Sequence, residues 1–148
     1  MLPRWHIILG VIFTGAVWAF IPSINKFYLG LVLFSSIFID FDHYIASVIK
    51  TKKLSFFHAL RYHKKVQEIE EKEHKRGLRR KGDFHLFHTI EFHLLIGLLS
   101  LLWTGFFFIF IGMAFHLFLD LFSLIKTDKL YRKEFFFTNW LANKLYFF

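Results

Sequence analysis

The sequence has 148 residues, a length that suits one domain and excludes two. Hydrophobic residues make up 55% of it and aromatic residues 22%, with 23 Phe, and a water-soluble core of this size could not bury so many rings. The formal net charge of +8 does not by itself indicate nucleic acid, because basic residues in a membrane protein mark its cytoplasmic loops. The sequence contains no Cys, which excludes disulfides, cysteine metal sites and thiol nucleophiles.

The first apolar segment, residues 5–21, contains no Lys, Arg, Asp or Glu and ends before Pro22. Arg4 precedes it, as in a signal peptide, but no small-residue cleavage site follows, so we expect a retained helix. A bilayer core about 30 Å thick needs roughly 20 apolar residues. The second segment, residues 27–49, approaches that length and is apolar apart from Asp40-Phe-Asp42-His43.

Residues 50–83 differ sharply from their surroundings. From Lys50 to Lys81 there are twelve Lys or Arg against four Glu, and residues 60–76 are compatible with a charged helix. We expect a solvated cytoplasmic loop that touches anionic lipid head groups; the alternative is a patch that recruits a phosphorylated lipid or nucleic acid as substrate.

Two more apolar segments follow, over residues 84–103 and 105–125, with Thr104-Gly105 as the predicted hairpin. The tail, residues 126–148, is basic at first and then aromatic, as an interfacial amphipathic segment would be. The sequence therefore predicts an all-α, polytopic membrane protein. We expect a four-transmembrane-helix bundle in one domain, with the basic loop between the second and third helices. The positive-inside rule places this loop and both termini in the cytoplasm of a multi-pass cell-membrane protein.

With this topology, the ionisable residues inside the spans all fall in one layer, in the cytoplasmic half. Charged groups within a bilayer are costly and are expected to face one another or a water-filled cavity. The spans contain carboxylates but no Lys or Arg, so a divalent cation is the expected source of positive charge. The predicted metal ligands are His6, Asp40, Asp42, His43, His88, His93, His116 and Asp120.

Helical spacing refines this set. Asp40 and His43 are three residues apart and His116 and Asp120 four apart, so each pair shares a helix face. Asp42 points away from Asp40 on an ideal helix, which leaves three interpretations: a helix end, a second metal, or an orienting role. Asp42 and Glu91 are the candidate general bases, and either is alternatively a partner that orients a ligand imidazole. His6 and His93 are alternatively hydrogen-bonded contacts between helices, and the role of His85 stays open.

Four short blocks resemble the bacterial and archaeal family of predicted membrane-bound (inner-membrane) metal-dependent hydrolases. They are "PRWHIILG", "IDFDH", "FHLFHTIEFH" and "AFHLFLD", one on each predicted span. The resemblance implies a metal site built from the His and Asp residues of these blocks. The third block departs from the family pattern at Thr89, Glu91 and Leu94, where Arg, Gly and Ser are usual.

The predicted function is that of a membrane metal-dependent hydrolase that cleaves an ester or phosphoester of a lipid-like substrate. One or two metal ions, most readily zinc with iron or manganese as alternatives, would activate water at the cytoplasmic side of the bilayer. Membrane lipid is the expected partner, with no specific nucleic acid, and an oligomer is compatible with the sequence. The main alternative is a metal-ion or proton transporter that uses the same cluster. A di-iron oxidase fits the His spacing poorly, and haem ligation would leave the Asp residues unexplained. A structural adaptor is the remaining option.

Overall fold

The computed structural model describes residues 3–146, and side chains from Trp5 onward. The described part of the chain is all-α, which confirms the predicted class. Its elements are α1 Pro3–Phe20, α2 Lys26–Phe38, α3 Phe41–Thr51, α4 Phe56–Lys75, η1 Leu86–His88, α5 Ile90–Leu99, α6 Thr104–Lys126, η2 Leu130–Arg132 and α7 Phe137–Tyr146.

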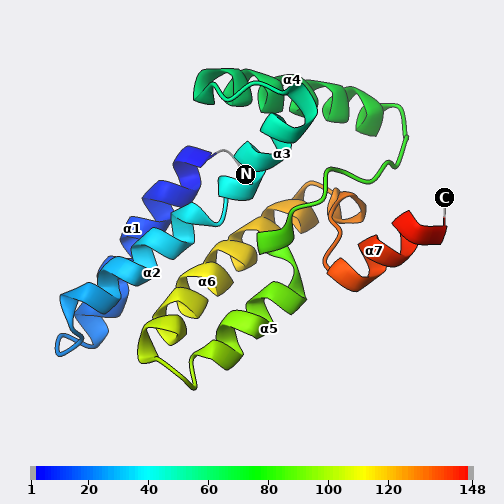
Figure 1. The fold of residues 1–148 in the computed structure, drawn as a ribbon. Coiled ribbons are helices and arrows are strands. Elements are labelled where there is room, and N and C mark those ends of the chain that lie inside the picture. Colours follow the sequence, from blue (N-terminus) through cyan, green and yellow to red (C-terminus); the bar gives the residue numbers. More distant parts are fainter. Residues whose placement is uncertain (1–2, 147–148) are drawn as a thin grey trace.

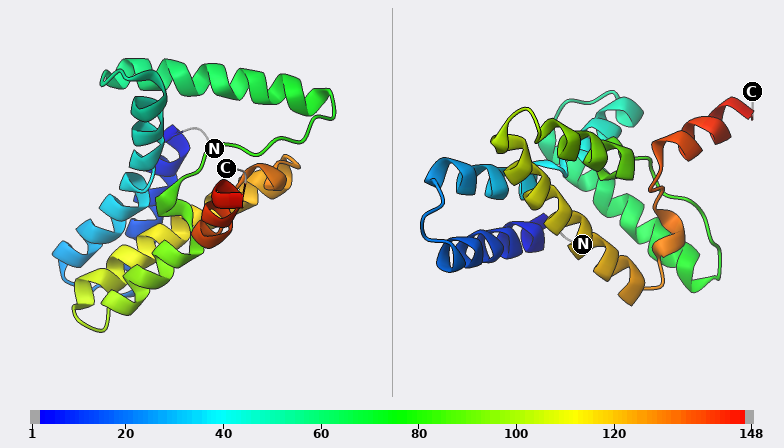
Figure 2. Two further views of the ribbon diagram at one scale, coloured as in Figure 1. Left: turned by 45° about the vertical axis from the view of Figure 1, so that its right-hand side comes forward. Right: turned by 90° about the horizontal axis from the view of Figure 1, so that it is seen from below.

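The helices α1, α2, α5 and α6 form two antiparallel hairpins, and α6 packs against the other three (Figure 1). The tips of both hairpins lie at one end of the molecule. At the other end, α3 continues upward from α2, and α4 crosses over the bundle (Figures 1 and 2). The chain then descends from α4 to η1, while η2 and α7 lie beside the end of α6. Thus α2 runs toward the end of the bundle that α4 covers, and α5 begins at that end.

Two of the four predicted spans are single helices in the structure. Residues 5–21 and 105–125 correspond to α1 and α6. The predicted helix over residues 27–49 is instead broken into α2 and α3 at Ile39–Asp40. The predicted span over residues 84–103 contains a helix of only 10 residues, α5, preceded by η1.

Polar caps explain where α2, α4 and α5 begin. The Thr89 side chain accepts a hydrogen bond from the Phe92 N–H and starts α5 there, whereas the sequence alone suggested one unbroken apolar run. Asn25 and Ser55 cap α2 and α4 in the same way. Ser100–Trp103, rather than Thr104-Gly105, forms the turn before α6.

The basic loop predicted over residues 50–83 contains the long helix α4, which includes most of the predicted charged helix. Arg132 in η2 holds α4 in place, because its guanidinium lies 2.9 Å from Glu70 and 3.8 Å from Glu73. The Tyr62 hydroxyl donates to Asp83 Oδ2 at 3.3 Å, and burial together with this carboxylate raises the pKa of Tyr62. The loop is thus a folded cover over one end of the bundle.

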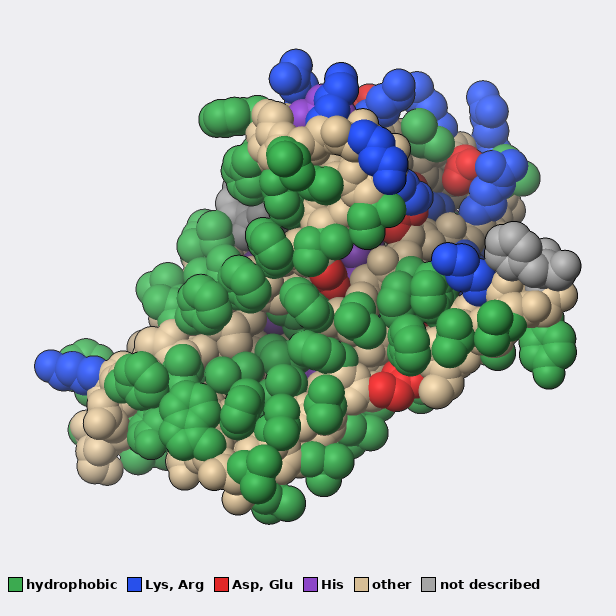
Figure 3. Space-filling model, in the orientation of Figure 1, with side chains coloured by type: hydrophobic (Ala, Val, Ile, Leu, Met, Phe, Trp, Pro, Cys, Tyr) green, Lys and Arg blue, Asp and Glu red, His purple; other side chains and the backbone are tan. Residues whose placement is uncertain are grey.

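Lys26–Thr51, taken as one segment across the break, and Thr104–Lys126 are long and apolar enough to cross a bilayer. The core helix of a soluble protein or a signal sequence meets the same criterion, so the four-span topology stays a prediction. Large apolar side chains are exposed along the outside of the hairpins, among them Ile12, Phe34 and Leu98. Figure 3 shows hydrophobic side chains over the lower part of the visible face, with Lys and Arg gathered along its upper edge.

The contact between α2 and α6 positions the polar residues of the interior. A Cβ at Gly112 of α6 would overlap the Ser35 hydroxyl and the Val32 carbonyl, so only glycine allows the two helices to lie this close. Gly10 of α1 meets Ser36 in the same manner. Three helices are therefore drawn together around the last turn of α2, directly before Asp40.

Candidate metal centre

Residues from four segments converge where α2 ends. His6 comes from the first turns of α1, Asp40 from the break between α2 and α3, and His88 from η1. His116 and Asp120 come from one face of α6. The break that the sequence did not predict therefore places a carboxylate at the junction of two helices, facing the other three segments.

Four side-chain atoms face one another at the centre of this cluster. His116 Nε2 lies 3.3 Å from Asp40 Oδ1 and 3.9 Å from Asp120 Oδ2. His88 Nε2 lies 3.7 Å from Asp40 Oδ1 and 3.6 Å from Asp120 Oδ2. A tetrahedral site with metal–ligand bonds of about 2.0–2.1 Å separates its ligand atoms by roughly 3.3–3.4 Å. These four separations equal or somewhat exceed this value. His88, His116 and Asp120 form one group close enough to share a metal ion, and Asp40 joins His116 in a group with His6 and joins His88 in a group with His43.

Hydrogen bonds fix the orientation of both central imidazoles. His116 Nδ1 lies 2.7 Å from the Ser36 carbonyl oxygen, which can only accept, so Nδ1 carries the proton. His88 Nδ1 lies 3.0 Å from Asp42 Oδ2 and donates to that carboxylate. Both Nε2 atoms are buried and have no hydrogen-bond partner among the described residues. An imidazole whose Nδ1 is held in this way presents its Nε2 lone pair to a metal ion.

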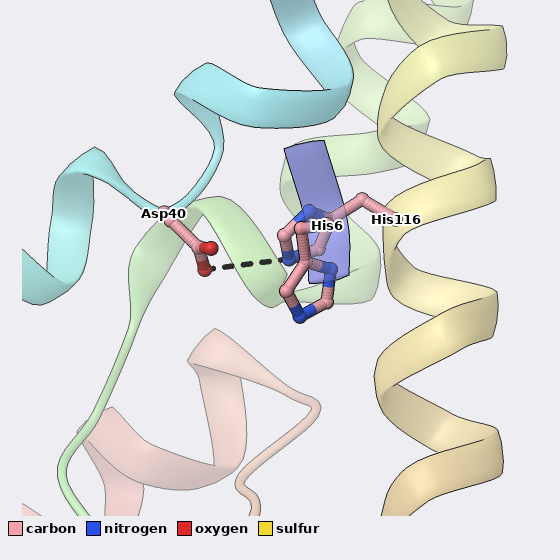
Figure 4. Close-up of side chains that lie close together, drawn as sticks. All are labelled: His6, Asp40 and His116. Carbon is pink, nitrogen blue, oxygen red and sulfur yellow. Dashed lines mark ion pairs between the residues drawn. The ribbon is translucent and has the colours of Figure 1, made fainter. Parts of the chain in front are cut away.

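His6 lies beside these four residues. Its Nε2 is 3.3 Å from Asp120 Oδ1, and its ring stacks on that of His116 with centroids 4.0 Å apart. Figure 4 shows the two rings side by side, with Asp40 facing His116. His6, Asp40 and His116 each offer a ligand atom within 4.8 Å of the others, so His6 is available as an additional ligand.

Asp42 contacts His88 at Nδ1, the ring nitrogen that does not face the proposed metal position. Its Oδ2 accepts hydrogen bonds from the Phe87 N–H at 3.1 Å and from His88 at 3.0 Å. This oxygen is thereby engaged in orienting His88, the orienting role that the sequence suggested for Asp42 beside those of metal ligand and general base. Its other oxygen, Oδ1, lies 3.6 Å from His85 Nδ1.

Two predicted site residues lie apart from the cluster. Glu91 accepts hydrogen bonds from the Phe137 N–H, the Thr138 N–H and the Thr138 hydroxyl, and so caps α7. His93 is buried, and its Nδ1 donates to the Thr89 carbonyl at 2.9 Å. Neither residue belongs to the groups of described side chains close enough to share a metal ion. The structure thus gives no support to Glu91 as a base or to His93 as a ligand.

The structure also adds a cation that the sequence did not suggest. Lys133, in the turn after η2, extends its amino group to 2.7 Å from Asp120 Oδ2, and its side chain is 12% exposed. The backbone around it is anchored on both sides, because the Gly82 N–H donates to Arg132 and the Ile90 N–H donates to Phe135. No local signal in the sequence shows that the tail folds back onto α6.

The side chains of the cluster differ in their exposure to solvent. The side chains of His88 and His116 are completely enclosed, whereas those of Asp40 and His43 are 25% and 37% exposed. His43 Nε2 lies 3.6 Å from Asp40 Oδ1, at the edge of the cluster. Imidazole and carboxylate groups of this kind suit zinc, with iron or manganese as less common occupants. Asp40 and His43 are therefore the most exposed side chains of the cluster.

An apolar groove of about 160 Å³ runs beside the centre, between α2, α5 and α6. Its lining residues include Ser35, Ile39, Phe87 and Met113. Ile39 and Phe87 directly precede Asp40 and His88 in the chain, so two residues that line the groove are chain neighbours of two candidate ligands.

Comparisons of this chain with protein-family models, with curated proteins and with solved structures found no match.

Proposed function

We propose that this chain is an integral-membrane metal-dependent hydrolase that acts on an ester or phosphoester of a lipid-like substrate at the cytoplasmic side of the cell membrane. One observation carries the proposal. Among the described residues, the buried Nε2 atoms of His88 and His116 have no hydrogen-bond partner, and they face the carboxylates of Asp40 and Asp120 at 3.3–3.9 Å. Buried polar atoms are almost always paired, so such a set implies a missing partner.

A divalent metal ion, zinc by preference, would polarise the scissile bond and lower the pKa of water at the site. The residues that would hold this ion are Asp40, His88, His116 and Asp120. His6 is an additional candidate ligand. Asp42 keeps the His88 ring in the ligand orientation. Among the three carboxylates of the cluster, Asp40 is the most exposed, at 25% against 13% for Asp120 and 7% for Asp42. We therefore assign to Asp40, in place of Asp42 or Glu91, the acceptance of a proton from water.

Lys133 favours an anionic substrate. If a metal ion bound Asp120, the Lys133 amino group would lose its present partner and could bind a phosphoryl oxygen instead. A neutral acyl ester has no group of comparable charge to offer. This makes a phosphoester the better substrate of the two.

The lipid-like character of the substrate follows from the groove and from the outer surface. The groove is comparable in volume to engineered apolar cavities of about 150 Å³ that take up benzene, so it accommodates part of a hydrocarbon chain. Soluble monomers rarely expose apolar patches larger than a few hundred Å². The exposed apolar side chains on all four bundle helices therefore support contact with lipid. A substrate that enters sideways from the bilayer would place its tail in the groove and its head group beside Asp40.

The test uses protein purified in detergent, loaded with zinc and reconstituted in vesicles that contain phosphatidic acid or a neutral diacylglycerol. We expect release of phosphate from the first lipid by the wild type and none by His116→Ala. Lys126→Met, which changes an exposed residue at the end of α6, should behave as wild type. A zinc-loaded wild type that releases neither phosphate nor fatty acid would overturn the proposal, and zinc accumulation inside the vesicles would favour transport instead.

A further inference from the structure

We infer that Asp42, His43 and His85 bind a second divalent metal ion, separate from the ion held by Asp40, His88, His116 and Asp120. Each of the three offers one ligand atom within 4.8 Å of the other two, and none is among the four central ligands. The inference rests on the proposed function only in treating the cluster as a metal centre. It adds His85, which the sequence left without a role.

Two unpartnered atoms carry this inference. Asp42 Oδ1 and His85 Nδ1 are both buried and have no hydrogen-bond partner among the described residues. They lie 3.6 Å apart, which is too far for a hydrogen bond. This separation is close to the roughly 3.3–3.4 Å between two ligand atoms of a tetrahedral zinc site. A cation between the two atoms would give each of them its missing partner.

His43 completes the site on its exposed side. It shares the first turn of α3 with Asp42, and its ring centroid lies 3.8 Å from that of His85. Helix α4 restrains the backbone of His43, because His63 Nε2 in α4 donates a hydrogen bond to the His43 carbonyl at 2.8 Å. Since the His43 side chain is 37% exposed, the remaining coordination positions face solvent. Three protein ligands with an open position are typical of catalytic rather than structural zinc sites.

Asp42 connects the two proposed positions. Its Oδ2 orients His88 of the first centre, and its Oδ1 is the ligand atom of the second. An ion on Oδ1 would therefore also restrain the His88 imidazole. The first centre and the second together contain three carboxylates, and Lys133 is the one cation among the described side chains that contacts them. One divalent ion offsets this excess of negative charge, and two leave an excess of positive charge that suits a phosphoester anion.

The test is the zinc stoichiometry of the full-length protein in detergent, after removal of metal with a chelator and titration with zinc alone. The binding isotherm and the zinc content after desalting are both measured. We expect two zinc ions per chain for wild type, one for His85→Ala, one for His116→Ala and none for the double variant. His74→Ala, on the far part of α4, is the matched control and should retain two. Helical circular dichroism and a single gel-filtration peak establish that each variant is folded. If His85→Ala does not fold, His85→Gln replaces it in the experiment.

The outcomes separate this inference from the proposed function. One zinc ion in wild type that His116→Ala loses and His85→Ala keeps would overturn the second site and leave the first. Two zinc ions in both wild type and His85→Ala would also overturn it. Loss of one ion in His85→Ala supports the second site, even if no lipid is hydrolysed.

Discussion

Replacing Lys133 by Met is expected to tighten zinc binding while weakening the metal-free protein. In the metal-free state the Lys133 amino group lies 2.7 Å from Asp120 Oδ2, with the two side chains 12% and 13% exposed. Zinc has to displace it from this oxygen. A hydrogen bond to a charged group contributes about 1.5–3 kcal/mol. Because 1.4 kcal/mol corresponds to a tenfold change in affinity, removal of the competing cation should raise the zinc affinity about ten- to hundredfold.

The same substitution leaves a partly buried carboxylate with one cation fewer. Breaking a buried pair from one side is strongly destabilising, so we expect the free energy of unfolding of the metal-free protein to fall by about 3 kcal/mol. Zinc should recover most of this loss, because a ligand that binds only the folded state stabilises it by mass action. Met keeps the length of the side chain, so packing beside η2 is preserved.

The assay is competition for zinc with a chelating dye, together with thermal unfolding in chelator and in excess zinc. Lys126→Met, an exposed change of the same kind on α6, should alter neither quantity. An unchanged or lower zinc affinity in Lys133→Met would show that Asp120 does not bind the metal, and this would refute the assignment of the four central ligands.

The structure makes three further predictions. Gly112→Val should overpack the contact between α2 and α6, lower the free energy of unfolding by about 1–3 kcal/mol and weaken zinc binding, as measured by thermal unfolding and dye competition. A zinc affinity equal to that of wild type would show that this contact does not position His116. Glu91→Gln should remove charge from the cap of α7 and cost about 1 kcal/mol, seen as faster hydrogen exchange in α7 alone, with zinc stoichiometry unchanged; a loss of zinc would contradict the capping role. His93→Ala should keep the full zinc content, and its loss would place His93 among the ligands.

The composition and the periodic apolar runs were sufficient to predict an all-α chain, and α1 and α6 lie where the sequence placed them. The break at Asp40 was considered only as a helix end, one of three interpretations of Asp42, and the apolar run by itself predicted one helix over residues 27–49. In the structure the end of α2 lies close to α6 at Gly112 and close to α1 at Gly10. The shortness of α5 follows from a cap at Thr89, a local signal that the apolar run obscured.

The grouping of ligands was predictable because a shared depth brings residues of different spans together. His6, Asp40, His43, His88, His116 and Asp120 were all placed in one layer, and the structure brings them into one cluster. The depth of a residue in the membrane does not show which way its side chain points around the helix axis. For this reason His93 was included among the predicted ligands, although its imidazole is hydrogen-bonded to the Thr89 carbonyl at the start of its own helix. Lys133 and the capping role of Glu91 depend on how the tail folds back, and no periodic pattern encodes that contact.

The central claim is that Asp40, His88, His116 and Asp120 bind a divalent metal ion, and X-ray absorption of the zinc-loaded protein tests it most directly. We predict a first shell of nitrogen and oxygen only, at about 2.0–2.1 Å, with the outer scattering that imidazole produces. His116→Ala and Asp120→Asn should each lose the zinc held there, as read from zinc content and a weaker imidazole signal. A wild type that retains no stoichiometric metal, or variants that keep the wild-type zinc content and spectrum, would contradict the account.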